Sequence, residues 1–224
     1  MSNLVGLNVG LSDSLSAKTR RFADYYRQLA AGTIKEVVDD ETISLMPIFY
    51  QTNVEKVSFA KCRSIYNNSF RECKKLFSAD FPEVRHIGSG CFRDTPSLSN
   101  IFFPEALTVV INAFIGSGVE TAELPKCKTL QPSVFQNCSA LKEIKIPVCA
   151  SIGNYAFSGC SALEKIFLDG VESVPTLGTG ALNGTPEGLK IIVPDNLVDA
   201  FKAATGWSAY ANKIVGISEY NSSP

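Results

Sequence analysis

The sequence contains few of the side chains from which most active sites are built. Its 224 residues include a single histidine, His86, and its seven cysteines form no Cys-x-x-Cys pair. Metal sites usually draw on clusters of Cys and His, and catalysis by a Ser–His or Cys–His pair would depend on His86 alone. The sequence also has no nucleophile elbow and no phosphate-binding loop. We therefore predict that the protein is not an enzyme and has no metal or cofactor, and that His86 is a surface or half-buried structural residue.

An excess of charge and long apolar runs are also lacking. The formal net charge is −1, so no basic field attracts nucleic acid or an anionic membrane. No stretch is long enough to cross a bilayer, and residues 1–14 lack the basic segment and apolar core of a secretory signal. We expect no nucleic-acid partner and no membrane insertion. A chain whose native start is Met1 would stay in the cytoplasm, but a cell-surface, secreted or virion protein whose signal had been removed would look the same.

The stretch 138–174 contains a sequence repeat with a fixed period. The residues CSAL at 138–141 return at 160–163, and the apolar–x–apolar triplet at 144–146 returns at 166–168, in each case 22 residues later. A constant period of this size is typical of a solenoid, in which every repeat forms one coil and stacks on the next.

The period extends over residues 41–194 as aligned columns of apolar side chains. One column is aromatic in all but its last position: Phe49, Phe70, Phe92, Phe114, Phe135, Phe157 and Leu182. A second column lies five residues before the first: Ile65, Ile87, Val109, Leu130 and Ile152. A third consists of apolar pairs, often followed by proline: Val57/Phe59, Ala79/Phe81, Ile101/Phe103, Ala122/Leu124, Ile144/Ile146, Ile166/Leu168 and Ile191/Val193.

These columns predict the architecture of a coil. An apolar–x–apolar triplet is a short strand with one buried face, and the same strand in successive coils pairs into a parallel sheet. Where proline follows the pair, it ends the strand because it lacks a backbone N–H. The aromatic column fills the interior on the opposite side. We predict a stacked structural spine with these central members: Phe70, Phe92, Phe114, Phe135 and Phe157.

The repeat resembles the leucine-rich repeats of BspA-like bacterial surface proteins, whose pattern is C-x-x-L-x-x-I-x-L-P followed by I-x-x-x-A-F. Residues 138–157 match this pattern at Cys138, Leu141, Ile144, Ile146, Pro147, Ile152, Ala156 and Phe157. The resemblance implies a curved leucine-rich-repeat solenoid of about seven coils with its parallel sheet on the concave side. We expect the solenoid at 41–194, an N-terminal helical cap at 1–40 and a C-terminal helical cap at 195–224.

Helical spacing in the two end segments indicates the caps. Residues 14–31 are expected to form an amphipathic helix that either covers the first coil or serves for docking. A helix is expected at 197–204, with Trp207 packed on the last coil rather than stacked on a ligand. The insertion at 171–185 is expected to bulge as a loop. The C-terminal segment is similar to the endings of repeat proteins from gut bacteria and their phages.

The cysteines follow the repeat. Cys138 and Cys160 occupy one position in adjacent coils, and Cys127 and Cys149 occupy another. Their spacing does not exclude disulfides, but we favour buried free thiols that pack as small apolar residues. A four-cysteine metal site would require two columns to converge, which we do not expect.

Two outward columns follow from the alternation of side chains along a strand: the residue between the members of each apolar pair, and the residue two positions earlier. From these columns we select eight candidate ligand contacts: Phe102, Phe167, Glu123, Lys145, Asp80, Ile192, Asn100 and Lys165. Aromatic anchors among mixed charges suit a protein or glycan partner. The alternative is that these side chains cover one another or contact a second copy of the chain in a homo-oligomer.

Two hypotheses for the function follow. The first is a non-enzymatic binding scaffold at a cell or virion surface, which recognises a protein or glycan through the concave sheet. The second is a structural component of an assembly, such as a phage or prophage virion protein, without a small-molecule ligand. An enzyme would require a polar pocket in the insertion at 171–185.

Overall fold

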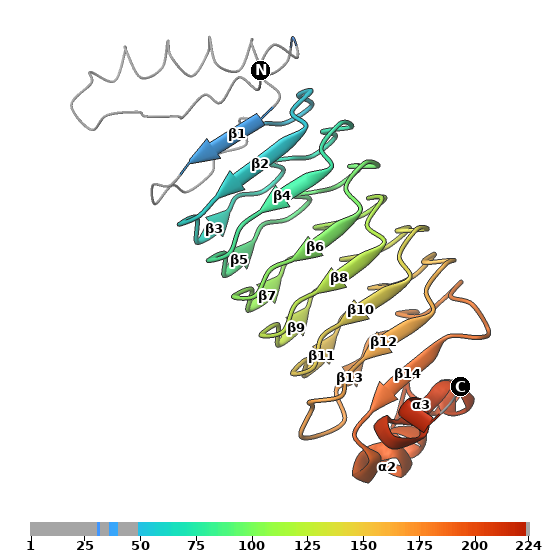
Figure 1. The fold of residues 1–224 in the computed structure, drawn as a ribbon. Helices are drawn as coiled ribbons and strands as arrows, with labels where there is room; N and C mark the ends of the chain where they lie inside the picture. The colour runs from blue at the N-terminus through green and yellow to red at the C-terminus, as the bar shows by residue number, and fades with distance from the viewer. Residues whose placement is uncertain (1–30, 32–35, 40–48, 223–224) are drawn as a thin grey trace.

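The chain forms a stack of coils whose strands all run parallel, each coil lying against the next along a single axis (Figure 1). This computed structural model describes residues 31, 36–39 and 49–222. The predicted solenoid is confirmed, and about seven coils can be counted along the buried column from Phe49 to Leu182. The helix expected at 14–31 lies outside the described residues.

The longer strands form the main ladder, which runs along one side of the stack. Ile144 pairs in register with Ala122 in the preceding coil and with Ile166 in the next. The strands are β1 (Glu36–Asp39), β2 (Lys56–Phe59), β4 (Ser78–Asp80), β6 (Asn100–Phe102), β8 (Thr121–Glu123), β10 (Glu143–Lys145), β12 (Lys165–Phe167), β14 (Lys190–Val193) and β15 (Ile214–Gly216). In the three-residue strands from β4 to β12 the middle residue points into the core and its neighbours point outward, whereas in β15 the core residue is the first, Ile214.

Strand pairing reaches into both segments expected to be helical caps. β1 lies within the range 1–40 and pairs with β2 of the solenoid. β15 lies within the range 195–224 and pairs with β14. A short apolar run can extend a parallel sheet wherever an open edge supplies the hydrogen-bonding partners. The sheet is therefore longer at both ends than the repeat columns predict.

A second parallel ladder runs along another side of the coils. It joins β3 (Ser64–Ile65), β5 (His86–Ile87), β7 (Thr108–Val109), β9 (Thr129–Leu130), β11 (Ser151–Ile152) and β13 (Thr176–Leu177). The apolar residues of this ladder form the column that begins at Ile65 and lies five residues before each spine Phe. The sequence did not predict strands there, because two residues are too few to show the alternation that identifies a strand. His86 lies in β5 and is exposed, as expected.

The third side of each coil is a corner built around the spine Phe. Consecutive spine rings from Phe49 to Phe157 are fully buried and stack with centroids 5.0–5.8 Å apart. Their backbone amides also link the coils: Phe92 donates to the carbonyl of Ala113 at 2.7 Å, and Phe135 donates to that of Ala156 at 2.8 Å. Each coil is thus tied to its neighbour by backbone hydrogen bonds as well as by packed rings.

Left-handed backbone on both sides of the Phe makes this corner tight. Positive φ angles recur two residues before the Phe at Asn68, Gly90, Asn112, Ser133 and Tyr155, and two residues after it at Glu72, Asp94, Gly116, Asn137 and Gly159. Gly has no Cβ to clash in this conformation, and Asn and Asp tolerate it better than most residues. The recurring Asn, Asp and Gly of the repeat therefore have a backbone role.

All seven cysteines are buried and free, which agrees with the interpretation favoured from the repeat. Cys138 donates from Sγ to the backbone carbonyl of Phe114 at 2.9 Å. Cys149 donates from Sγ to the backbone carbonyl of Ser151 at 3.3 Å. The thiols are thus weak hydrogen-bond donors as well as packing groups.

The main ladder is interrupted once in the part of the chain from 49 to 222. β1, β2 and β4 form one sheet, and β6 through β15 form another, so β4 and β6 are not joined by strand hydrogen bonds. The wider spacing between β4 and β6 can be followed in Figure 1. Ala79 of β4 is half-buried, whereas the equivalent Val57 and Ile101 are buried. We call this interruption the seam.

The C-terminal segment closes the last coil with short helices and one strand. β14 is followed by η1 (Asp195–Leu197), α2 (Val198–Ala203), η2 (Ser208–Lys213), β15 and α3 (Ile217–Ser222). Trp207 is fully buried, packs edge-on against Phe201 at 5.1 Å, and donates from Nε1 to the carbonyl of Pro175 at 2.7 Å. Trp207 therefore packs on the last coil as predicted, and burial leaves its ring no face for a ligand.

The extra residues of the insertion lie between β12 and β13. Ser151 of β11 pairs with Thr176 of β13, 25 residues later, whereas Thr129 pairs with Ser151 at an interval of 22. The expected loop at 171–185 is therefore confined to the stretch before Thr176, because the chain returns there to its place in the second ladder.

Candidate binding face

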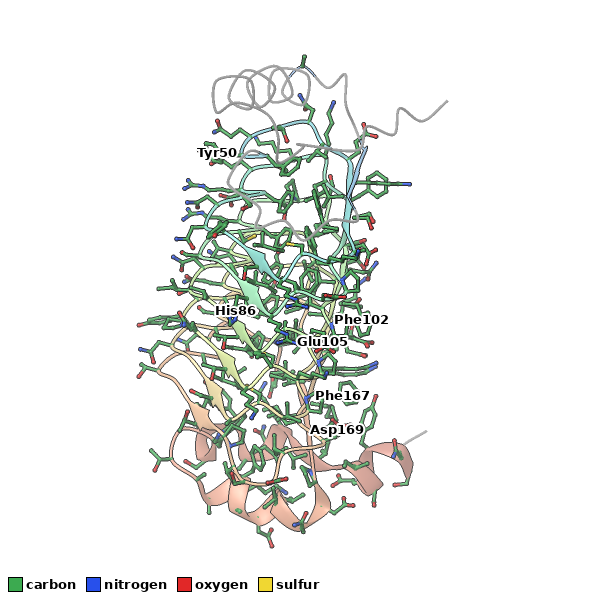
Figure 2. All side chains as sticks on the ribbon, turned by 90° about the vertical axis from the view of Figure 1, so that its left-hand side faces the viewer. Tyr50, His86, Phe102, Glu105, Phe167 and Asp169 are labelled. Atoms are coloured by element: carbon green, nitrogen blue, oxygen red, sulfur yellow. The ribbon has the colours of Figure 1, made fainter. Side chains whose placement is uncertain are left out.

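The solvent-facing side chains of the main ladder form what we call the outward face. It is the surface a partner would meet, because alternate residues of each strand are committed to the core. Figure 2 shows Phe102 of β6 and Phe167 of β12 on the same side of the molecule. All eight predicted contact residues belong to this face, but the structure divides them among three environments.

The centre of the outward face is a network of ion pairs. Lys145 Nζ donates to Glu123 Oε1 at 2.8 Å and lies 3.7 Å from Glu143, which in turn is 3.6 Å from Lys165. The hydrogen bond with Glu123 raises the pKa of Lys145 above its ordinary value. Exposed pairs of this kind contribute about 1 kcal/mol or less each, so a partner could rearrange them at little cost.

One end of the outward face is covered by the chain's own C-terminal helix. Phe167 packs edge-on against Tyr220 of α3, with ring centroids 5.7 Å apart. Ile192 is only 1% exposed although it lies outside the core cluster, because α3 contacts β14 on this side. The expectation that Ile192 contacts a ligand is therefore corrected: its side chain faces outward but is buried beneath α3.

The other end of the outward face contains a cleft at the seam, with a volume of about 360 Å³. Two phenylalanines line it, Phe77 at 46% exposure from the residue before β4 and Phe102 at 57% exposure from β6. The remaining lining residues are Ser78, Ala79, Asp80, Asn100, Ile101, Thr121 and Glu123. Four of the predicted contacts thus lie together here: Asp80, Asn100, Phe102 and Glu123.

Hydrogen bonds hold the polar groups of the cleft in place. Ser58 Oγ donates to Asp80 Oδ2 at 2.9 Å, and Thr121 Oγ1 donates to Asn100 Oδ1 at 2.6 Å. Each bond joins side chains from adjacent coils and restricts the rotamers of the acceptor, so less conformational entropy is lost when a ligand binds. The cleft is in this sense organised before any ligand arrives.

Phe77 was missed by sequence reasoning because it precedes the strand and belongs to neither outward column. A signal was nevertheless present. The equivalent positions of the other coils before the insertion are polar or charged, namely Glu55, Ser99, Glu120, Lys142 and Glu164, and only the last coil has an apolar residue there, Leu189. One aromatic residue in a polar column marks a coil whose surface differs from that of its neighbours.

A second hollow of about 360 Å³ lies beside the insertion. Its lining includes Lys128, Glu172 and Cys149, and burial raises the pKa of the Cys149 thiol above its ordinary value. A thiol held protonated is a poor nucleophile. No group of three or more metal-ligating side chains occurs in the described part of the chain.

Comparison with known proteins identifies the repeat. A family model described as the BspA type leucine-rich repeat region matches residues 46–147 and 108–204, with 6 copies of the repeat. No curated protein matches the sequence. None of the helices among the described residues is both long enough and apolar enough to cross a membrane.

Three similar solved structures are of bacterial proteins. A leucine-rich repeat protein from Bacteroides ovatus is 23% identical, with a TM-score of 0.49, over 75% of this chain and 45% of that one. A leucine-rich cell surface protein from Faecalibacterium prausnitzii is 18% identical, with a TM-score of 0.41, over 71% and 60% of the two chains. The pneumococcal vaccine antigen PcpA is 18% identical, with a TM-score of 0.34, over 73% and 55%. The matched part of this chain corresponds to roughly half of each of these proteins.

Proposed function

This chain belongs to the BspA type leucine-rich repeat family, and on that premise we propose that it is a non-catalytic binding scaffold that recognises a protein or glycan through its outward face. The setting we propose is a cell or virion surface, and the resemblance to BspA-like surface proteins supports the first of these. The fold supports such a role because core and surface are separate along every strand. The side chains of the outward face can serve recognition without disturbing the spine.

The observation that carries the proposal is the pair of exposed aromatic side chains at the seam. An isolated exposed apolar residue is ordinary, but Phe77 and Phe102 line the same cleft beside carboxylate and amide groups. Binding energy concentrates in aromatic anchors that become desolvated at the centre of an interface. The strand and backbone network beneath them supplies a rigid support.

The test is a screen of the full chain against a panel of glycans and cell-surface proteins. Phe102→Ala should weaken any genuine hit at least tenfold, or about 1.4 kcal/mol, without lowering the thermal midpoint. Tyr66→Ala is the matched control, because Tyr66 is 50% exposed but lies next to β3, outside the main ladder.

Equal losses in the two variants would contradict the proposal, as would a hit that Phe102→Ala leaves unchanged. Absence of any hit would favour the assembly role instead. In that case the partner could be a second copy of the chain, and light scattering over a concentration series would detect its self-association.

A further inference from the structure

The cleft at the seam belongs to a rigid part of the solenoid. The two coils that it separates remain joined on their other two sides: Ile87 of β5 pairs with Val109 of β7, and Phe92 donates to the carbonyl of Ala113 at 2.7 Å. The coils are thus fixed on two sides while the third side lacks strand hydrogen bonds. Such a cleft is pre-organised, because its walls need not be ordered when a ligand binds.

A change in core packing accompanies the opening. The rings of Phe59 and Phe81 stack in parallel 5.5 Å apart, whereas Phe81 and Phe103 meet edge-on at 6.2 Å, on the core side of the seam. Ala79 packs against the core and lines the cleft, and it supplies a small side chain at a position that holds Val57 and Ile101 in the adjacent coils. The smaller side chain leaves more space between these two coils.

The cleft combines apolar walls with hydrogen-bond acceptors. The π face of a phenylalanine is electronegative and attracts polarised C–H groups, which the faces of sugar rings present. Phe102 is 57% exposed and can offer such a face, whereas Lys56 Nζ already lies over the Phe77 ring, 5.6 Å from its centroid. The carboxylate of Asp80 engages Ser58 through Oδ2, which leaves the lone pairs of Oδ1 unused by that bond. Carboxylate and amide oxygens in this cleft suit a ligand rich in hydroxyl donors.

The charges of the cleft discriminate among carbohydrates. Its lining among the described residues includes the carboxylates of Asp80 and Glu123 and no cationic side chain. Glu123 is already paired with Lys145 at 2.8 Å. Lys56 Nζ lies 5.6 Å from the centroid of the Phe77 ring, outside this lining. The like charge that a sialic or uronic acid would meet is therefore that of Asp80, whose Oδ2 accepts a hydrogen bond from the uncharged hydroxyl of Ser58, and this contact is unfavourable. A neutral sugar meets no such repulsion.

The size of the cleft favours a sugar over an extended peptide. About 360 Å³ lies near the lower end of the range for small-molecule sites, roughly 300–1,000 Å³. Strand addition would require a free sheet edge of useful length, but β4 and β6 are three residues long and face each other. A compact ligand with two apolar faces fits this geometry better.

We propose that the seam cleft, with Phe77 and Phe102 as its walls and Asp80 and Asn100 at its floor, binds the terminal rings of neutral glycans and rejects their acidic counterparts. This inference rests on the binding function proposed above and narrows it to one ligand class and one site.

The experiment compares neutral oligosaccharides, ending in galactose, mannose or N-acetylglucosamine, with the sialylated forms of the same glycans. The full chain is tested on an array, and hits are quantified by calorimetry. Neutral forms should bind, and sialylation should weaken binding at least tenfold. Asp80→Asn should reduce the affinity for neutral forms and narrow the difference between the two series, because it removes one repelling carboxylate.

Ala79→Ile provides a second, structural test. It places in β4 the core-facing side chain that Ile101 has in β6, reduces the space between the two coils, and should abolish glycan binding. The thermal midpoint, measured alongside, separates this effect from a loss of folding by overpacking. Tyr66→Ala again serves as the control that leaves binding unchanged.

The outcomes separate this inference from the function on which it rests. Preferential binding of acidic glycans, or glycan binding that survives Ala79→Ile, would overturn the carbohydrate site. A protein or peptide hit that Phe102→Ala weakens, without any glycan hit, would also overturn it but would leave the outward face as the binding surface. If neither a glycan nor a protein binds, the carbohydrate site and the proposed binding function are both overturned.

Discussion

The position three residues after each spine Phe is filled by a small hydrogen-bond donor. Thr95 donates from Oγ1 to the carbonyl of Phe92 at 2.7 Å, and Cys160 donates from Sγ to the carbonyl of Phe135 at 3.1 Å. Hydroxyl and thiol thus satisfy the same kind of buried backbone acceptor. The position alternates among Thr, Ser and Cys because the corner requires a compact donor, not cysteine chemistry.

The clearest test at the residue scale is truncation of one spine ring. Phe135 is fully buried, and its ring stacks 5.0 Å from Phe114 and 5.8 Å from Phe157. Phe135→Ala should lower the free energy of unfolding by about 3–5 kcal/mol, because the bonded coils above and below cannot collapse into the cavity. Urea denaturation followed by circular dichroism measures the loss.

Phe102→Ala is the matched control, since it removes the same ring from the surface. A change within about 0.5 kcal/mol is expected there. A similar loss in both variants would mean that the interior stack does not carry the stability assigned to it.

At the scale of elements, the outward face differs at its two ends because of α3. Asp195 holds this helix by accepting hydrogen bonds from the backbone amide and hydroxyl of Ser218 at 3.1 and 2.7 Å. The helix then covers Ile192 and contacts Phe167 through Tyr220. The covered end is stabilised by intrachain packing, and the seam end is left accessible.

Deletion of residues 217–224 should uncover that end without removing β15. Re-exposure of Ile192 should cost about 1.5–3 kcal/mol of unfolding free energy and should create an apolar patch beside Phe167. Thermal unfolding and the fluorescence of a hydrophobic dye report the two effects. If α3 is only loosely attached, neither quantity will change, and the binding face would then extend over Phe167 and Ile192.

At the scale of the whole molecule, buried thiols distributed along the solenoid couple its stability to alkaline pH. Burial raises the pKa of Cys73 and of Cys138 to about 11 and that of Cys127 to about 12. A thiol in the unfolded chain has a pKa of about 8.5, so it loses its proton at a lower pH than the same thiol in the folded chain. Stability is therefore fully present below about pH 8.5 and falls as pH rises toward 11, because only the unfolded chain releases protons in that interval.

The expected slope is about 1.4 kcal/mol per pH unit for each such thiol. Urea midpoints at pH 7, 8.5 and 10 would measure it. The variant Cys73→Ser/Cys138→Ser isolates the thiols, since a serine already occupies the equivalent position at Ser117 and does not titrate. Its slope should be shallower than that of the parent chain. Equal slopes would assign the alkaline loss of stability to other groups.

The sequence by itself determined the coil. The interval of 22 residues, the Phe column and the apolar triplets predict the parallel main ladder, the interior spine and the outward residues, because burial of these side chains depends on local spacing. The same reasoning placed Asp80, Asn100, Phe102 and Glu123 on the outward face. The stacking of coils brings residues one period apart into contact, so the sequence already implies which of them are neighbours.

The tertiary structure alone decided where that regular face is open and where it is closed. The seam lies between the coils of Ala79 and Ile101, and Ile192 is buried where α3 folds back from the end of the chain onto β14. Neither follows from a repeat pattern, because each depends on contacts between segments whose relative placement the period does not specify. A repeat predicts what successive coils have in common, and the candidate site lies where two of them differ.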